Sequence, residues 1–281
     1  MKDSSSFKHM KNSSSLTLTI IQTDISWENK EANLQMLERK IHSIVDKAEI
    51  IILPEMFSTG FSMNAAELAE NMEGPTINWM RRIAASNNII LTGSVIIREN
   101  EQFFNRLIWM LPNGQLGYYD KRHLFAFGGE DLYYSSGQKR FIASVKGWKI
   151  NLQICYDLRF PVWARQSSAA LEQNPEFPEY DLLIYVANWP ERRNIAWKTL
   201  LRARAIENQC YAVGVNRVGN DGNNIYHSGD SMIIDPVGEI LYEKHNDEDV
   251  YTYTLTAETL TKARSKFPFW KDADKFNIIH Q

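Results

Sequence analysis

Residues 148–161 read Trp-Lys-Ile-Asn-Leu-Gln-Ile-Cys-Tyr-Asp-Leu-Arg-Phe-Pro, so a cysteine directly follows an apolar run. The run predicts a strand, and Pro161 suits the first position of a helix. Cys155 therefore stands where the chain leaves a strand and turns toward a helix. Such a turn exposes the sulfur, and the N–H groups of a helix start favour the thiolate. The position indicates a nucleophile, although a lone cysteine is also typical of a buried core.

A carboxylate follows a second predicted strand. Residues 50–53 are Ile-Ile-Ile-Leu, an apolar run that predicts a buried strand, and Pro54 ends it because proline cannot continue a central ladder. Glu55 then stands at the edge of the strand, beside Met56 and Phe57. A carboxylate among apolar groups has a raised pKa and can exchange protons near neutral pH. The alternative is a surface loop glutamate.

A lysine follows a predicted hairpin. Residues 106–112 and 114–119 read as two strands that turn at Asn113-Gly114, a dipeptide typical of tight hairpins. Lys121 lies just beyond the second strand. On its own it is indistinguishable from a surface lysine. Its interest comes from its place in the chain, between a candidate base and a candidate nucleophile.

Together these three segments resemble the nitrilase superfamily, whose catalytic residues are a glutamate, a lysine and a cysteine in that chain order. The resemblance covers nearly the whole chain from about Leu16. Within the superfamily the chain is most similar to the bacterial ω-amidases. It departs from the family pattern in a longer N-terminus and a polar insertion around residues 166–179. The segments that carry the resemblance are residues 53–57, 119–125, 155–161, 185–190 and 204–209.

The resemblance implies an α/β fold, a four-layer αββα sandwich, with dimers or higher homo-oligomers that extend the stack. No linker rich in Gly, Ser or Pro divides the chain, so we expect one domain over residues 16–281, preceded by a disordered extension over residues 1–15. The residue patterns agree with alternating α/β packing. They predict helices at 28–47, 77–86, 194–208 and 257–264, and strands at 16–22, 50–53, 89–98, 103–111, 114–119, 141–145, 148–154, 181–186, 211–217, 231–235 and 250–255.

The resemblance also implies a covalent mechanism. Glu55 would take the thiol proton while Cys155 attacks an amide carbon, and water would later hydrolyse the thioester. Lys121 and the backbone N–H of Tyr156 would hold the oxyanion. Glu130 lies in a segment, 130–137, that matches the one holding a second glutamate in the family. It would orient Lys121 or the substrate, although a surface carboxylate is the alternative.

Residues on the substrate side are less distinctive. Asn188 and Trp189 follow a predicted strand, 181–186, and should face the same edge as Cys155. Trp189 is a candidate for one wall of the pocket, although an ordinary core tryptophan is an equally good interpretation. Arg159 is a candidate for binding a substrate carboxylate, although an arginine there often forms a structural ion pair. The implied substrates are short dicarboxylic acid monoamides, such as 2-oxoglutaramate and 2-oxosuccinamate.

Composition narrows the class of protein. The net charge of −3 gives no basic footprint for nucleic acid, and no run of residues is apolar enough to span a membrane. Two cysteines suit a reducing compartment, so we expect a cytoplasmic protein. The six histidines show no metal-ligand spacing and no glycine-rich phosphate loop occurs. We therefore expect no metal and no cofactor, with a small amide and water as the only reactants.

The sequence leaves three alternative functions open. Another activity of the superfamily is one: an aliphatic amidase, a nitrilase or an N-carbamoyl amidohydrolase. A catalytically idle binding protein of the same fold is the second, although the joint presence of Glu55, Lys121 and Cys155 argues against it. A papain-type Cys/His hydrolase is the third, and it would require His123 or His227.

Overall fold

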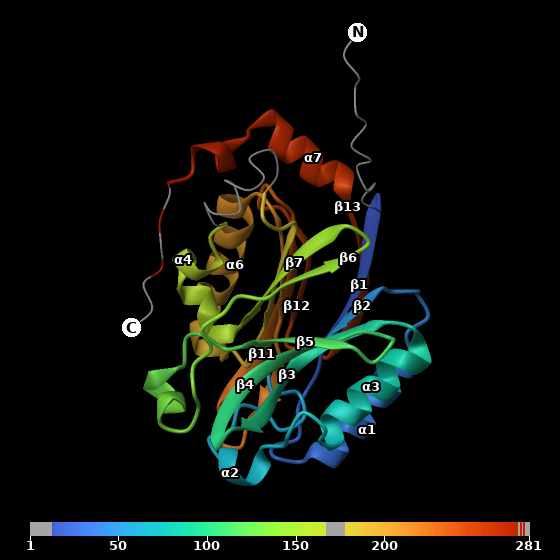
Figure 1. Cartoon of the computed structure of the whole chain (residues 1–281), viewed down its shortest axis with the longest axis vertical. Coiled ribbons are helices and arrows are strands. Elements are labelled where there is room, and N and C mark those ends of the chain that lie inside the picture. Colours follow the sequence, from blue (N-terminus) through green and yellow to red (C-terminus); the bar gives the residue numbers. More distant parts are fainter. Residues whose placement is uncertain (1–12, 167–177, 275, 277, 279–281) are drawn as a thin grey trace.

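The computed structural model describes residues 13–166, 178–274, 276 and 278, which form two mixed β-sheets with helices on their outer faces (Figure 1). The strands are β1 (Ser15–Gln22), β2 (Ile50–Ile52), β3 (Ile90–Glu99), β4 (Gln102–Met110), β5 (Leu116–Asp120), β6 (Ile142–Val145), β7 (Trp148–Ile154), β8 (Leu182–Val186), β9 (Tyr211–Val215), β10 (Val218–Asn220), β11 (Tyr226–Ile234), β12 (Ile240–His245) and β13 (Asp249–Thr256). The α-helices are α1 (Lys30–His42), α2 (Ala65–Leu68), α3 (Pro75–Asn87), α4 (Pro161–Ala164), α6 (Asn194–Asn208) and α7 (Ala257–Lys266). Short 3₁₀ helices are η1 (Ala126–Gly128), η2 (Glu130–Leu132), η3 (Cys155–Arg159), η4 (Glu191–Arg193) and η5 (Phe269–Asp272).

The first sheet has the strand order β13-β1-β2-β3-β4-β5. Its centre is parallel, because α1 connects β1 to β2 and α3 connects β2 to β3. Its edges are antiparallel hairpins, and β4 pairs with β5 from Arg106 opposite Asp120 to Met110 opposite Leu116. The predicted turn at Asn113-Gly114 lies between these two strands.

The second sheet has the order β10-β11-β9-β8-β7-β6, with β12 paired to β11. Strands β7, β8 and β9 are parallel, so their carboxyl ends meet at one edge. Cys155 follows β7 at this edge, and Asn188 follows β8 two residues after its end. In the first sheet, Glu55 follows β2 after Leu53 and Pro54.

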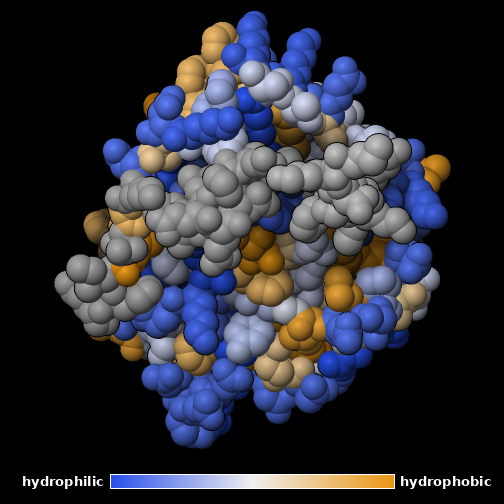
Figure 2. All heavy atoms as spheres, turned by 45° about the horizontal axis from the view of Figure 1, so that its top comes forward, coloured by the Kyte–Doolittle hydropathy of each residue, from blue (hydrophilic) through white to orange (hydrophobic). Residues whose placement is uncertain are grey.

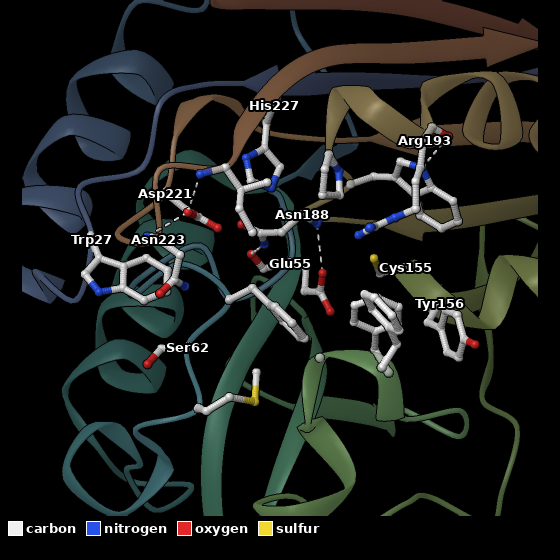
Figure 3. Close-up of a pocket in the computed structure, with 18 of the residues that line it drawn as sticks. Trp27, Glu55, Ser62, Cys155, Tyr156, Asn188, Arg193, Asp221, Asn223 and His227 are labelled. Atoms are coloured by element: carbon white, nitrogen blue, oxygen red, sulfur yellow. Dashed lines mark hydrogen bonds between the residues drawn. The ribbon is translucent and has the colours of Figure 1, made fainter.

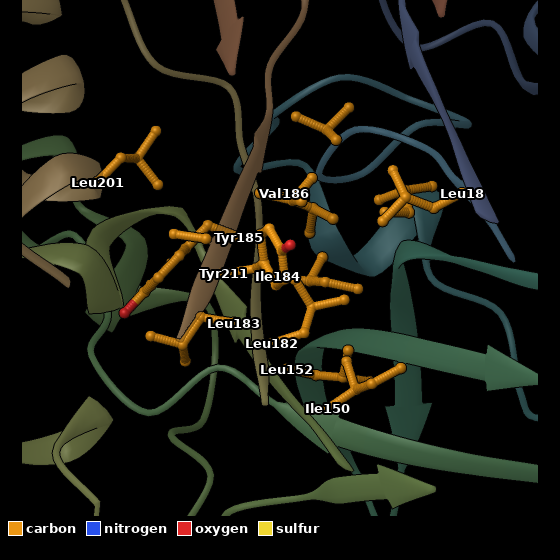
Figure 4. Close-up of a cluster of buried hydrophobic side chains, with 14 of the residues drawn as sticks. Leu18, Ile150, Leu152, Leu182, Leu183, Ile184, Tyr185, Val186, Leu201 and Tyr211 are labelled. Atoms are coloured by element: carbon orange, nitrogen blue, oxygen red, sulfur yellow. The ribbon is translucent and has the colours of Figure 1, made fainter. Parts of the chain in front are cut away.

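Successive side chains along the strands point alternately into two apolar cores, one between the sheets and one beneath the helices. In β1 and β2, Leu18, Ile20 and Ile52 belong to the core between the sheets, whereas Ile21 and Ile51 face α1 and α3. This is the period of two expected for a sheet that is buried on both faces. Figure 4 shows the inter-sheet and α6 side of this core, including Leu18, Leu152, Ile184 and Leu201.

The order of layers is therefore helix, sheet, sheet, helix, which confirms the predicted αββα sandwich. Helix α6 covers β9 and β11 on the far side of the second sheet. Gly214 permits this close packing, because a Cβ at this position would lie 2.7 Å from Trp197 Cζ2. None of the helices in the described part of the chain is long and apolar enough to cross a membrane.

The structure corrects several predicted boundaries. Helix α1 is shorter than the predicted range 28–47, and the short elements α2, β10 and β12 were not predicted. The residue spacing also predicts an inner face of α6 with Ala196, Leu200, Ala203 and Ile206. The buried face is displaced by one residue, since Trp197, Leu201 and Ala205 are fully buried whereas Ile206 is 49% exposed. Most of the predicted loop at 166–180, and residues 1–12 of the expected extension, lie outside the described residues.

The visible coloured surface in Figure 2 is mainly hydrophilic, with hydrophobic side chains in separated groups. Large exposed apolar side chains include Val45, Phe127 and Ile195. Single exposed apolar residues are ordinary on a folded protein.

Candidate active site

A cavity of about 560 Å³ lies where β2, β7 and β8 end, and the three predicted catalytic residues line it (Figure 3). Glu55 comes from the first sheet and Cys155 from the second, while Lys121 follows the edge strand β5. Tyr156, whose backbone N–H is the predicted oxyanion donor, also lines the cavity, as do the predicted substrate-side residues Arg159, Asn188 and Trp189. The structure thus brings together segments that are far apart in the chain.

Lys121 is buried between two carboxylates. Its Nζ donates to Glu55 Oε1 at 2.9 Å and to both oxygens of Glu130, at 3.0 and 2.9 Å. Asn105 Nδ2 adds a bond to Glu55 Oε1 at 2.8 Å. All four side chains are at most 1% exposed. Glu130, for which a surface position was the alternative, is therefore part of the buried cluster.

Burial and charge act in opposite directions on this cluster. Burial alone would lower the pKa of Lys121, but the carboxylates of Glu130 and Glu55 outweigh it and raise the pKa. Burial raises the pKa of Glu130, although the positive charge of Lys121 opposes the rise. The lysine therefore remains an ammonium at neutral pH, which is the form that can stabilise an oxyanion.

Cys155 lies at a strained turn. Its φ is 42°, in the left-handed region that non-glycine residues seldom adopt. This geometry directs a nucleophile away from the strand that precedes it, as in other strand-to-helix elbows. Strain of this kind persists only where the surroundings hold it, and it gathers at functional sites.

The thiol differs from its predicted state. Cys155 is 9% exposed, and burial raises its pKa well above the ordinary value, with the negative charge of Glu55 adding to the rise. Lys121 opposes this shift but does not cancel it. The expectation of a thiolate favoured by the helix start is therefore wrong for the protein without substrate. A protonated thiol needs a base, and its side-chain partner is the carboxylate of Glu55.

Asp157 holds the turn of Cys155, a role that we did not predict from the sequence. Its Oδ2 accepts from the backbone N–H of Ile154 at 3.1 Å and from the hydroxyl of Tyr119 at 2.8 Å. Its Oδ1 accepts from the backbone N–H of His123 at 3.0 Å and lies 2.8 Å from His123 Nδ1. Asp157 therefore connects the turn of the candidate nucleophile to the residues on either side of Lys121. The only indication of this role in the sequence is the position of Asp157, two residues after the cysteine.

Asn188 positions Glu55. Its backbone N–H donates to Glu55 Oε2 at 2.8 Å, and its Nδ2 donates to the Glu55 backbone carbonyl at 2.5 Å. The residue after Glu55, Met56, has a φ of 44°, and its N–H donates to Ser94 Oγ at 2.8 Å. Asn188, predicted to lie on the substrate side, therefore also holds the candidate base Glu55 in position.

The candidate carboxylate-binding arginine, Arg159, has no acidic partner among the described residues. Arg159 lies with its Cζ 5.0 Å from the ring centre of Trp189, and Arg193 lies 5.1 Å from that of Phe125. Neither forms an ion pair with an acidic residue within the described ranges. Trp189 is 4% exposed and donates from Nε1 to the carbonyl of Arg193 at 2.8 Å. It is therefore both a wall of the cavity and part of the core.

The two histidines that could serve a papain-type mechanism, His123 and His227, lie in different surroundings. His123 is bound to Asp157 and stacks on Phe160, with ring centres 3.8 Å apart. His227 lines the cavity. In the described residues, the side-chain partner of the Cys155 thiol is Glu55 rather than a histidine. This geometry disfavours a Cys/His pair.

Residues 17–265 match the family model for carbon-nitrogen hydrolases, so the chain belongs to that family. This confirms the expected nitrilase-superfamily hydrolase, an amidase. An ω-amidase named YafV from Escherichia coli K12 is 40% identical, over 94% of this chain and 98% of its own length. A 2-oxoglutaramate amidase from Bacillus subtilis is 32% identical, over 92% of this chain and 98% of its own length.

Solved structures agree with this placement. A CN-hydrolase superfamily protein from Xanthomonas campestris, which carries an arsenic adduct in its active site, superposes with a TM-score of 0.91 at 44% identity, covering 94% of this chain and 99% of its own. Nit3 of Saccharomyces cerevisiae, a nitrilase-superfamily member, has a TM-score of 0.79 at 25% identity, covering 94% and 97%. The similarity therefore covers nearly the whole of each chain.

Proposed function

We propose that this amidase is an ω-amidase, which hydrolyses the terminal amide of short dicarboxylic acid monoamides such as 2-oxoglutaramate and 2-oxosuccinamate. The observation that carries the proposal is the cavity itself. It combines Cys155, Glu55 and Lys121 with two arginines, Arg159 and Arg193, that have no acidic partner in the described residues. The names of the E. coli and B. subtilis relatives support the same substrate class.

Acylation begins from a protonated thiol. Glu55, which interacts with the Cys155 thiol, accepts its proton as the sulfur attacks the amide carbon. The ammonium of Lys121 and the backbone N–H of Tyr156 stabilise the oxyanion. Glu55 then transfers the proton to the amide nitrogen, the C–N bond breaks and ammonia leaves. The acyl group remains on the sulfur as a thioester.

Deacylation uses the same groups. Glu55 removes a proton from a water molecule, which attacks the thioester carbon, and the thiol regains its proton as the carboxylic acid leaves. Glu130 holds Lys121 through two bonds, at 3.0 and 2.9 Å, and so keeps the ammonium directed at the reacting oxygen. Asn188 holds Glu55 from the opposite side.

The free carboxylate of the substrate needs cationic partners. Arginine is suited to this task because its planar fork can bind both carboxylate oxygens. Burial, together with the neighbouring charge of Arg192, lowers the pKa of Arg193. A bound carboxylate would relieve this crowding of cations. We therefore assign the acid end of the substrate to Arg159 and Arg193.

Substrate pairs test the assignment. We expect kcat/KM for 2-oxoglutaramate to exceed that for a neutral amide of equal length by roughly tenfold to a hundredfold, since the unpaired arginines cost about 1–3 kcal/mol. Arg159→Met and Arg193→Met should each reduce this ratio, whereas the surface change Arg98→Met should not. Equal kcat/KM for both compounds in the unmodified enzyme would favour a general aliphatic amidase. Faster turnover of a nitrile or an N-carbamoyl acid would favour the other branches.

We further propose a cytoplasmic homodimer. Both cysteines are free thiols, which suits a reducing compartment. Val162 on α4 and Ile195 at the start of α6 are 54% and 78% exposed, and burial against a second copy would remove this apolar surface from water. Sedimentation analysis of the protein and of Ile195→Asp tests the dimer. A monomer at micromolar concentration, or an unaffected dimer in Ile195→Asp, would contradict the proposed face.

A further inference from the structure

The cavity extends to both sides of Glu55. Figure 3 shows Cys155, Tyr156 and Arg193 on one side of this carboxylate, and Trp27, Ser62 and Asp221 on the other. Its volume of about 560 Å³ lies in the range of pockets that enclose drug-sized ligands. A five-carbon monoamide has only about ten non-hydrogen atoms, so it would occupy a part of such a pocket. The side beyond Glu55 is therefore open to a further group.

The two sides differ in charge. Arginines line the side of Cys155, whereas two carboxylates, Glu28 and Asp221, line the other. Asp221 Oδ1 accepts from the backbone N–H groups of Asn223 and Ile225 at 2.8 and 2.9 Å, and Glu28 Oε1 accepts from Ser62 Oγ at 2.5 Å. Within the described residues the second oxygen of each carboxylate has no hydrogen-bond partner, and neither group is in an ion pair.

His227 adds an independent sign of a ligand. It is 2% exposed, its ring points into the cavity in Figure 3, and its Nδ1 has no hydrogen-bond partner in the described part of the chain. Burial, with the charge of Arg217 adding, lowers the pKa of His227 to about 4. The imidazole is therefore neutral at pH 7 and has one nitrogen that can accept a hydrogen bond.

Trp27 provides an aromatic wall beside these acceptors. Its ring lies between Gly60 and Gly222, since a Cβ at these positions would lie 3.1 Å from Trp27 Cε3 and 2.5 Å from Trp27 Cδ1, respectively. The lack of a side chain at these two glycines leaves room for the ring beside the cavity. Two carboxylates, a neutral imidazole and an indole are the groups that recognise an alkylammonium ion.

We propose that this second side, bounded by Trp27, Glu28, Asp221 and His227, binds an ammonium group carried by the leaving amine. The inference rests on the proposed ω-amidase reaction. In that reaction the acyl group stays on Cys155, on the arginine side, while the leaving nitrogen takes its proton from Glu55. A substituent on this nitrogen would pass Glu55 and enter the acidic side. The substrate class is therefore a dicarboxylate monoamide whose amide nitrogen carries a short aminoalkyl chain.

The chemistry balances without a further reactant. The Cys155 sulfur forms a bond to the amide carbon, and the carbon–nitrogen bond breaks as Glu55 protonates the nitrogen. A diamine leaves in place of ammonia. Water then cleaves the thioester, so that amide and water give a carboxylate and a protonated diamine.

Three substrates separate this inference from the proposed function. They are glutaramate, its N-(4-aminobutyl) amide and its uncharged N-pentyl amide. We expect kcat/KM for the aminobutyl amide to exceed that for the pentyl amide by about twofold to fivefold, the range of partly exposed ion pairs. The preference should shrink as salt rises to about 0.5 M, because salt screens exposed charges.

Matched variants locate the effect. Asp221→Asn keeps the Oδ1 that caps the turn, and Glu28→Gln keeps the acceptor for Ser62, so both retain the local fold. Each should lower the ratio of kcat/KM for the two N-alkyl amides toward one. Glu191→Gln removes an exposed carboxylate of η4 that does not line the cavity, and its ratio should equal that of the unmodified enzyme. Because the ratio is taken within each protein, a general loss of activity cancels.

These measurements distinguish failure of the proposed function from failure of the ammonium subsite. Failure to hydrolyse glutaramate and the 2-oxo acid amides would overturn the proposed function. Hydrolysis of glutaramate with equal kcat/KM for the two N-alkyl amides, or without turnover of either, would overturn only the ammonium subsite. The same conclusion would follow if Glu191→Gln reduced the ratio as strongly as Asp221→Asn, since net charge would then explain it.

Discussion

Cys155 combines a left-handed backbone, with a φ of 42°, and a thiol whose pKa is raised by burial and by Glu55. The thiol is therefore protonated at rest, and the reaction depends on a neighbouring base. Such an arrangement limits reaction with other electrophiles until a substrate is bound, since the thiolate is the reactive form. At the scale of single residues, the chemistry follows from which groups share one buried space.

Replacement of the nucleophile tests this view. We expect Cys155→Ala to abolish ammonia release while circular dichroism remains unchanged, because the change removes the sulfur and little volume. Cys155→Ser should also be nearly inactive, since a hydroxyl is much harder to ionise than a thiol. Substantial turnover by purified Cys155→Ala protein would contradict the mechanism.

The proposed role of Lys121 is both catalytic and structural. Lys121→Met should reduce kcat by about 10²–10³-fold, which is typical for loss of one oxyanion donor. It should also destabilise the fold by about 3–5 kcal/mol at neutral pH, because two buried carboxylates lose their cation. Turnover within a few fold of the unmodified enzyme would contradict the catalytic part.

The stability loss in Lys121→Met should depend on pH. Without the cation, burial raises the folded-state pKa of Glu130 further above its unfolded value. Such a group binds its proton more strongly in the folded state, so its stabilising contribution is present at low pH and lost as pH rises through the folded pKa. Urea unfolding of both proteins from pH 5 to pH 8 measures this. A loss of unfolding free energy in Lys121→Met that is equal at pH 5 and pH 8 would contradict this explanation.

At the scale of elements, the turn from β7 into η3 is joined to the end of β5 through Asp157. The carboxylate receives donors from Ile154 on β7, from Tyr119 on β5 and from His123 beyond it. It thus connects the segment that carries the nucleophile with the segment that carries Lys121. A shift of about 1 Å between such groups can reduce a rate by about a hundredfold.

Asp157→Asn tests this connection. The amide introduces a donor where Asp157 has only acceptors, so the turn must move. We expect kcat to fall by about tenfold to a hundredfold with little change in KM, and the rate of Cys155 alkylation by iodoacetamide to change as well. His123→Gln leaves three of the four donors to Asp157 and should have a smaller effect. An altered melting temperature with unchanged kcat and alkylation rate would leave Asp157 a purely structural role.

At the scale of the whole molecule, the site depends on the packing of one sheet on the other. Glu55 and Cys155 belong to different sheets, and the apolar core between them includes Leu18 and Leu152. Packing density in such a core resembles that of a crystal, so the sheets hold a fixed separation. The geometry of the site is therefore a property of the entire sandwich.

A cavity in this core should affect stability more than chemistry. Leu18 is fully buried, and Leu18→Ala should lower the free energy of unfolding by about 2–5 kcal/mol. Val45 is 96% exposed, and Val45→Ala should change the free energy of unfolding by less than about 0.5 kcal/mol. Urea titration measures both. Near-equal stability of the two variants would contradict the assignment of Leu18 to the inter-sheet core.

Local sequence patterns predicted which segments form helices and strands better than they predicted the length or the buried face of each element. The strands that precede Glu55 and Cys155 were recognised because each is an apolar run ended by a turn. The buried face of α6 was misplaced because Arg204 and Asn208 lie on it, where Arg204 donates to the carbonyl of Leu158 at 2.5 Å. Strand β12 was missed because its residues are largely exposed and lack an apolar alternation.

By itself the sequence determined the strand ends that carry Glu55 and Cys155, because these depend on neighbours in the chain. Its resemblance to a known family implied the class of fold and the order of the proposed catalytic residues. Only the tertiary structure decided that Lys121 lies between Glu55 and Glu130, that Asp157 holds the turn of the proposed nucleophile and that burial raises the pKa of its thiol. Hydrogen bonds between distant segments and the loss of solvent around a charge arise from packing. No local pattern of residues contains that information.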